Sequence, residues 1–154
     1  MSVTVAPLGA QALGEAAQAL GRGALLGRYG LSQEGLLRLL QGAHQRGEGL
    51  LGAYGEGQGP MLGLAWYLPR GALGTAAYLR LLLVAEGAQR RGVGGQLVAA
   101  FEAACMVPKG GFFVLTEQQG GAEAFYGRHG YRPVGPLPGF VQKGRTELLL
   151  WKSP

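Results

Sequence analysis

The chain has 154 residues and a formal net charge of +5, from 14 basic and 9 acidic side chains. Apolar residues make up 47% of it and charged residues only 15%, which excludes a disordered chain and allows a domain-sized core. No apolar run reaches the length of a membrane span, and residues 1–5 lack the basic segment of a secretion signal. We therefore expect one domain over residues 1–154, cytoplasmic and without a membrane partner.

The basic charge is spread thinly along the chain, apart from the pair Arg90-Arg91. No basic run is interleaved with aromatic residues, and no cysteine–histidine spacing is typical of a zinc site. The charge therefore favours an anionic small molecule over nucleic acid, with a nucleic-acid-binding protein as the rival. The single Cys105 excludes an internal disulfide and is expected to pack on a helix.

The first half of the chain predicts a strand, two helices and a hairpin. In order, the expected elements are a strand at 3–5, a helix at 10–20, a helix after Ser32, and strands at 49–54 and 61–68. Pro7 is expected to close the first strand, and Ser32 is typical of a helix N-cap. A glycine-rich loop through Gln58 joins the two later strands.

The second half alternates strands with helices. We expect strands at 78–85, 112–116, 132–134 and 147–151, with helices from Val93 to a stop at Pro108 and at 122–129. Gly130 is placed as a left-handed cap of the last helix. Pro136 and Pro138 are expected to lie in the connection between the last two strands. This order predicts a single α/β domain with a mixed sheet.

The segment 89–97 (QRRGVGGQL) places a basic, glycine-rich turn between a strand and a helix. Amides at a helix start have no intrahelical partner, and the helix dipole adds positive charge there. The segment therefore predicts a pocket for a phosphorylated cofactor. A plain tight turn is the alternative, because 30 of the 154 residues are glycine. The dinucleotide pattern G-x-G-x-x-G is not met, since Leu97 occupies its last position.

Two segments, 89–94 (QRRGVG) and 122–131 (AEAFYGRHGY), together resemble the GCN5-related N-acetyltransferases, the GNAT family. The first matches the family's pyrophosphate-binding pattern of Gln or Arg, two residues, Gly, one residue, then Gly or Ala. The second is similar to the family's later helix, with an aromatic–Tyr pair and a Gly–aromatic step. The resemblance spans nearly the whole chain. It implies a mixed, mostly antiparallel, splayed sheet flanked by about four helices.

The resemblance also implies acetyl-CoA as co-substrate, with no metal. Backbone amides of the glycine turn would bind its pyrophosphate, and the preceding strand end would pair with the pantetheine arm and offer an N–H to the thioester carbonyl. The implied cofactor-binding residues are Leu83, Val84, Ala85, Gln89, Arg90, Arg91, Gly92, Val93, Gly94, Gly95, Gln119 and Tyr126. Gln119 stands where the family often has an asparagine that contacts the pantetheine.

Tyr126 occupies the position of a family tyrosine near the cofactor sulfur and is the candidate general acid for the leaving thiolate. The general base stays open. Some members carry a glutamate early in the fourth strand, but the matching region here holds Tyr78. Glu86 and Glu117, at the ends of the two central strands, are candidate bases, and deprotonation through water is equally compatible with the sequence.

The acceptor is the least defined part. By resemblance it would be bound near the first helices and the connection between the last strands, which points to Arg28, Tyr29 and Phe140. No acidic cluster is present there, so a polycation is disfavoured, and a small primary amine or a protein N-terminus is expected. The alternative is a non-catalytic acyl-CoA sensor or interaction module. Either a monomer or a homodimer fits the sequence.

Overall fold

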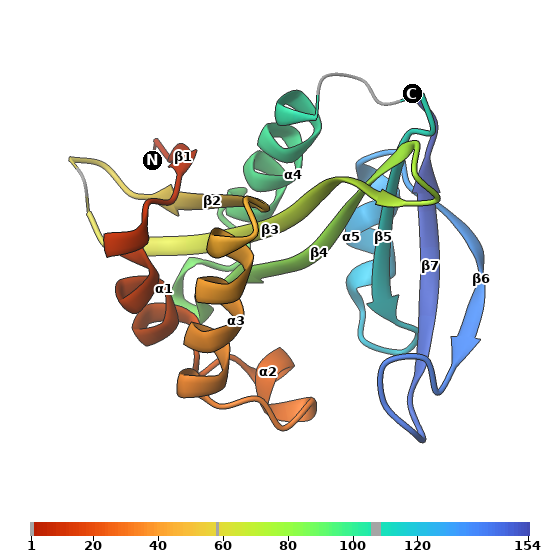
Figure 1. Ribbon diagram of the computed structural model, residues 1–154, viewed down its shortest axis with the longest axis horizontal. Coiled ribbons are helices and arrows are strands. Elements are labelled where there is room, and N and C mark those ends of the chain that lie inside the picture. Colours follow the sequence, from red (N-terminus) through yellow and green to blue (C-terminus); the bar gives the residue numbers. More distant parts are fainter. Residues whose placement is uncertain (1, 58, 106–108) are drawn as a thin grey trace. The chain divides into compact units, whose positions relative to one another are not determined.

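The computed structural model describes residues 2–57, 59–105 and 109–154 (Figure 1). The helices are α1 (Leu13–Leu20), α2 (Ala24–Arg28), α3 (Gln33–Gln45), α4 (Val93–Ala104) and α5 (Ala122–Arg128), with 3-10 turns η1 (Ala10–Ala12) and η2 (Glu86–Ala88). The strands are β1 (Thr4–Pro7), β2 (Gly49–Tyr54), β3 (Met61–Ala72), β4 (Ala76–Val84), β5 (Phe112–Glu117), β6 (Arg132–Pro138) and β7 (Thr146–Lys152).

The described strands form one seven-stranded sheet in the order β1-β2-β3-β4-β5-β7-β6. The pairs β1–β2, β2–β3, β5–β7 and β6–β7 are antiparallel, whereas β4 and β5 pair in parallel, with residues 77–79 opposite residues 112–114. The predicted mixed, mostly antiparallel α/β fold is therefore confirmed.

The chain folds as two compact units. The first comprises residues 1–67 and 81–104, and the second residues 68–80 and 105–154. Strands β3 and β4 each contribute residues to both units. The expectation of a single domain stays a prediction, and each unit is described below by itself.

In the first unit, helices cover both faces of the strands. Leu64 and Trp66 of β3 belong to a core cluster with leucines of α1 and α3, such as Leu36. Tyr67 points to the opposite face, where its ring lies 5.4 Å from that of Phe101 on α4. Figure 1 shows α1 and α3 on one side of these strands and α4 on the other.

In the second unit, the two faces of the sheet differ. Val114, Leu148 and Leu150 are buried on the face that α5 covers. The other face carries Phe113 and Trp151, whose rings lie 6.4 Å apart across β5 and β7. Figure 1 shows α5 behind β5 in this view. Side chains of β7 therefore alternate between the face that α5 covers and the face of Phe113 and Trp151.

Several predicted elements are confirmed. β2 has the predicted bounds, and Ser32 caps α3 through a 3.0 Å hydrogen bond from the Gly35 N–H to its hydroxyl. Gly130 follows α5 with a φ of +92°, the left-handed conformation expected of a cap.

Other predictions differ from the structure. Pro136 and Pro138 lie inside β6, so placing them in a connection was wrong. β6 is an edge strand, where proline is tolerated because an outward N–H is not needed for pairing. The short α2 was not expected, and β3 extends past residue 68. The predicted helix stop at Pro108 and the loop residue Gln58 lie outside the described residues.

In the described part of the chain, no helix is both long and apolar enough to cross a membrane.

Candidate active site

The turn between β4 and α4 has an unusual backbone. After the strand, η2 forms one tight turn and Gln89 returns to an extended conformation, with φ −64° and ψ 149°. Arg90 then adopts a φ of +66° and Gly92 a φ of +79°. α4 begins immediately afterwards at Val93. Two left-handed residues within three positions turn the chain sharply into the helix.

Arg90 stands out because it is not a glycine. A side chain in the left-handed region costs about 1–2 kcal/mol, since its Cβ crowds the following carbonyl oxygen. Arg90 and Arg91 are both exposed. The chain thus tolerates backbone strain to hold a cationic residue at this turn, and such strain is typical of ligand-binding sites.

The start of α4 supplies hydrogen-bond donors. The Gln96 N–H already donates to the Gly92 carbonyl oxygen at 3.1 Å. The amides of Val93, Gly94 and Gly95 precede it, in the part of a helix whose N–H groups have no intrahelical acceptor. With the two exposed arginines, these amides fit a phosphorylated group. The residues present therefore suit the pyrophosphate that the family resemblance implies.

The end of β4 presents one backbone donor to the side away from β3. The Ala85 N–H donates to the Leu62 carbonyl oxygen of β3 at 2.8 Å. Because N–H directions alternate along a strand, the Val84 N–H points to the opposite edge of β4. Of the three strand-end residues named from the sequence, Val84 is thus the one whose amide faces away from β3. Leu83 is buried, 5% exposed, and packs in the core.

This strand, strained turn and helix lie within residues 44–144, which match the family model described as an acetyltransferase (GNAT) domain. The chain belongs to the GNAT family. The match covers well over half of the chain and includes both motifs from which the resemblance was drawn. No curated protein sequence matches the chain significantly.

Solved structures show the same fold. An acetyltransferase from Thermus thermophilus is 22% identical, with a TM-score of 0.75 over 97% of this chain and 96% of that one. A GNAT acetyltransferase from Bacillus cereus is 12% identical, with a TM-score of 0.76 over 99% and 98%. A ribosomal-protein-alanine N-acetyltransferase from Brucella melitensis is 21% identical, with a TM-score of 0.67 over 98% and 99%. At these identities the likeness concerns the fold alone.

Tyr126, the candidate acid of this GNAT chain, is a core residue of the second unit. It is 5% exposed, and its ring lies 5.0 Å from that of Phe125 and 5.7 Å from that of Tyr131. Burial raises the pKa of its hydroxyl well above the usual value, and the nearby Tyr78 raises this pKa further. The hydroxyl is therefore protonated at neutral pH, as a proton donor must be.

The two candidate bases lie in different surroundings. Glu86 is exposed in η2, in the first unit. Glu117 ends β5 in the second unit, and its Oε2 lies 2.5 Å from Nη1 of Arg145. Its side chain is 16% exposed. Gln119 is exposed in the turn that follows β5.

The predicted acceptor residues are divided between the units. Arg28 ends α2 and Tyr29 caps it, both in the first unit. Phe140 is 67% exposed in the connection between β6 and β7, in the second unit. Arg28 and Tyr29 thus lie in one unit and Phe140 in the other, and their shared role stays a prediction.

The burial of Glu147 was not predicted from the sequence. Among residues 2–57, 59–105 and 109–154 it is the one buried polar or charged side chain, 4% exposed. It lies on β7 directly opposite Glu117. The sequence did contain a signal for it. Glu147 is a single acidic residue directly before the apolar run 148–151, at a position where a buried strand usually has a hydrophobic residue.

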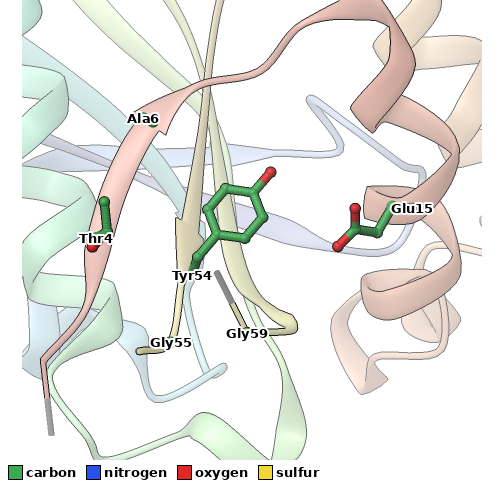
Figure 2. Close-up of a pocket in the computed structure, with 6 residues that line it drawn as sticks. All are labelled: Thr4, Ala6, Glu15, Tyr54, Gly55 and Gly59. Atoms are coloured by element: carbon green, nitrogen blue, oxygen red, sulfur yellow. The ribbon is translucent and has the colours of Figure 1, made fainter. Parts of the chain in front are cut away.

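A separate cavity of about 450 Å³ lies in the first unit (Figure 2). Its lining residues are Thr4, Ala6, Glu15, Tyr54, Gly55 and Gly59. Figure 2 shows the Glu15 side chain directed from α1 toward the side of the Tyr54 ring. Burial, and then the charge of Glu15, raise the pKa of Tyr54. No residue of the predicted site lines this cavity.

Proposed function

We propose that this GNAT chain transfers the acetyl group of acetyl-CoA to a primary amine by direct attack in a ternary complex. The single observation that carries the proposal is the turn of residues 89–95. There, left-handed Arg90 and Gly92 lead into the first amides of α4 beside two exposed arginines. This arrangement suits the pyrophosphate of coenzyme A, which the family's pattern also specifies.

Direct transfer needs three things: a neutral amine, a polarised carbonyl and a protonated leaving group. Acetyl-CoA supplies an activated thioester carbonyl. The Val84 N–H, on the side of β4 away from β3, is the proposed donor to that carbonyl oxygen. Tyr126, whose raised pKa keeps its hydroxyl protonated, is the proposed donor to the thiolate.

For the acceptor we propose a small amine or a protein N-terminus. An α-amine has an unperturbed pKa of about 7.7–8.0, against about 10.4 for a lysine side chain, so it needs less help to become neutral. Exposed Phe140 supplies an apolar contact, and Arg28 is a cation that disfavours a polycationic acceptor. The similar protein from Brucella melitensis is named for acetylating a ribosomal-protein alanine, which makes an N-terminal α-amine the first acceptor to test.

Thermal denaturation tests the cofactor. A ligand that binds only the folded state at 100 times its Kd adds about 2.7 kcal/mol of stability. Acetyl-CoA is therefore expected to raise the Tm, while an equal concentration of adenosine leaves it unchanged. No shift at millimolar acetyl-CoA would contradict both the enzyme and the alternative, a non-catalytic acyl-CoA sensor.

A turnover assay separates the enzyme from the non-catalytic sensor. With acetyl-CoA bound, an enzyme releases free thiol only when a suitable amine is added, whereas a sensor releases none with any amine. The nucleic-acid rival makes a different prediction, namely salt-dependent retention on DNA or RNA.

A further inference from the structure

The cavity of Figure 2 lies in the first unit, where α1 faces the paired strands β1 and β2. Thr4 of β1 pairs with Tyr54 of β2, so both side chains leave the sheet on one face, where Tyr54 packs against the core cluster of α1 and α3. Ala6 shares this face but carries only a methyl group. The other wall residues Gly55 and Gly59 have no side chain. Small residues at the rim of a packed core therefore leave the hollow.

Two walls of the cavity are connected by hydrogen bonds. The Glu56 carboxylate accepts hydrogen bonds from the Ser2 N–H and the Ser2 hydroxyl, at 3.2 and 3.3 Å. Glu56 directly follows the lining residue Gly55, and Ser2 lies two residues before the lining residue Thr4. These contacts join the loop after β2 to the chain before β1, two segments that line the same hollow.

The polar groups of the lining are a carboxylate, a phenol and an aliphatic hydroxyl, from Glu15, Tyr54 and Thr4. Figure 2 shows the Glu15 side chain directed from α1 toward the side of the Tyr54 ring. Burial raises the pKa of Tyr54 and the charge of Glu15 raises it further, so the two groups lie close enough to interact. In the described part of the chain, none of the ion pairs involves Glu15.

The walls are negatively charged in a chain that is positive overall. Residues 2–20 and 49–59, which supply β1, α1, β2 and the loop after it, contain Glu15 and Glu56 but no lysine, arginine or histidine. All 14 basic residues lie elsewhere in the sequence. The one that follows α1 most closely, Arg22, is seven residues beyond Glu15, about 10 Å along a helix axis. The local charge therefore attracts cations and repels anions.

The cavity is separate from the proposed acetyl-CoA site. The sheet order places β3 between β2 and β4. Tyr54 pairs with Met61 at the start of β3, and the Ala85 N–H donates to the next residue, Leu62. Val84, the proposed carbonyl donor, therefore lies two strands away from Tyr54, roughly 10 Å at the usual strand spacing. The glycine turn leads into α4, which covers the opposite face of these strands.

We propose that this cavity binds a small organic cation. The Glu15 carboxylate lies against the positive charge, the Tyr54 ring packs against the apolar part, and the Thr4 hydroxyl accepts a hydrogen bond from any N–H. A volume of about 450 Å³ is within the range of small-molecule sites. A cation close to an aromatic ring is also attracted by the electrons of the ring. The inference goes beyond the proposed function and does not depend on it.

The test uses benzyltrimethylammonium, which joins a permanent positive charge to an apolar ring. It has no N–H bond, so it cannot accept an acetyl group. Two-dimensional ¹H–¹⁵N NMR of the wild type without acetyl-CoA measures the Kd and locates the site. We expect saturable shifts of the Thr4, Ala6, Tyr54 and Gly55 amides, with a Kd in the millimolar range because the ligand is small. Shifts confined to residues outside the lining, or no saturable shift at all, overturn the proposal.

Two compounds of similar size test the selectivity for charge. Benzyl alcohol is neutral and phenylacetate is an anion, and each carries the same apolar ring as the cation. We expect both to bind at least about five-fold more weakly than benzyltrimethylammonium, because neither can pair with a carboxylate. Equal affinity for the cation and for benzyl alcohol overturns the proposal, since the hollow would then select only an apolar ring.

Glu15→Gln tests the carboxylate, and Glu34→Gln is the matched control. Both glutamates are exposed and lie in the first turn of a helix of the same unit. Glu15→Gln is expected to weaken binding of benzyltrimethylammonium about five-fold, the scale of one charge contact at a partly exposed site, while Glu34→Gln leaves the Kd unchanged. An unchanged Kd in Glu15→Gln overturns the proposal. So does an equal loss in both variants, which would reflect net charge alone.

Ala6→Leu tests whether the cation enters the hollow. The larger side chain fills the cavity and leaves the Glu15 carboxylate in place, so saturable binding should be lost. An unchanged Kd in a folded Ala6→Leu, checked by its Tm, places the cation on the open surface and overturns the proposal. If Ala6→Leu does not fold, the comparison of Glu15→Gln with Glu34→Gln decides.

The outcomes also separate this inference from the proposed function. A wild type that binds benzyltrimethylammonium in the cavity but acetylates no amine contradicts the proposed function alone. A wild type that acetylates an amine but does not bind benzyltrimethylammonium contradicts this inference alone.

Discussion

Arg145 holds Glu117 in an ion pair, with 2.5 Å between its Nη1 and the carboxylate Oε2. The two side chains are 31% and 16% exposed, so water screens the pair only in part. The pair also neutralises one of two carboxylates that face each other across β5 and β7.

A double-mutant cycle with Arg145→Gln and Glu117→Gln should therefore give a coupling energy of about 1 kcal/mol in urea denaturation. Arg145→Gln alone should be the most destabilising of the three variants, because it leaves two carboxylates opposite each other. Additive effects would show that the ion pair contributes nothing.

Gly92→Ala should weaken both stability and acetyl-CoA binding. At a φ of +79°, an alanine costs about 1–2 kcal/mol in the folded state, although the space around its Cβ is open. Gly87→Ala is the matched control, since Gly87 lies in the same connection, has open space and no positive φ. Equal Tm and Kd values for the two variants would contradict the role given to the left-handed turn.

Val84→Pro should lower kcat about 10²–10³-fold, the usual effect of removing one oxyanion donor. Proline deletes the N–H that faces away from β3, so the β3–β4 pairing through Ala85 is retained. Val84→Ala shortens the side chain but keeps the N–H, and should leave kcat within a few-fold of wild type. If acetyl-CoA still raises the Tm of both variants, both variants fold. Equal kcat values for Val84→Pro and Val84→Ala would show that a group other than the Val84 N–H binds the thioester carbonyl.

The buried Tyr126 hydroxyl predicts how stability depends on alkaline pH. Its pKa is raised in the folded state above an unfolded value of about 10, so it stabilises the fold below pH 10. This contribution is lost as the pH rises toward the folded-state value, because only the unfolded chain ionises readily. Urea denaturation between pH 8 and 11 should thus show a steeper loss for wild type than for Tyr126→Phe. Parallel curves would contradict the burial of this hydroxyl.

The raised pKa of Tyr126 also predicts how the activity depends on pH. Because Tyr126 keeps its proton, the rate should not fall between pH 7 and pH 10 through loss of the acid. Tyr126→Phe should lower kcat about 100-fold while the Kd for acetyl-CoA stays within a few-fold. An unchanged kcat in this variant would remove Tyr126 from the acid role.

Periodicity and turn chemistry predicted most of the fold. The N-cap at Ser32 and the left-handed turn at Gly130 were predictable because each depends on the residue type at one position. The strand predicted at 132–134 was confirmed, but its continuation to Pro138 was missed because proline is typical of a loop, and only the sheet shows that β6 is an edge strand. The five residues of α2 are too few for a helical period to be visible.

The strand, turn and helix of the candidate donor site were predictable because they are local in the sequence, whereas their role in binding stays a prediction. The surroundings of the acceptor could not be predicted in this way, because strand register decides which residues face one another. Glu147 lies opposite Glu117, for example, although the two residues are 30 apart in the chain by their numbers. No pattern of neighbouring residues contains that information.

The most direct test of the proposed function is thiol release by the wild-type protein in the presence of acetyl-CoA and a panel of amines, including peptides with a free N-terminal alanine. The account predicts release that depends on the amine, with an acetylated product heavier by one acetyl group in mass spectrometry. Binding of acetyl-CoA with no acetylated product from any amine would contradict it.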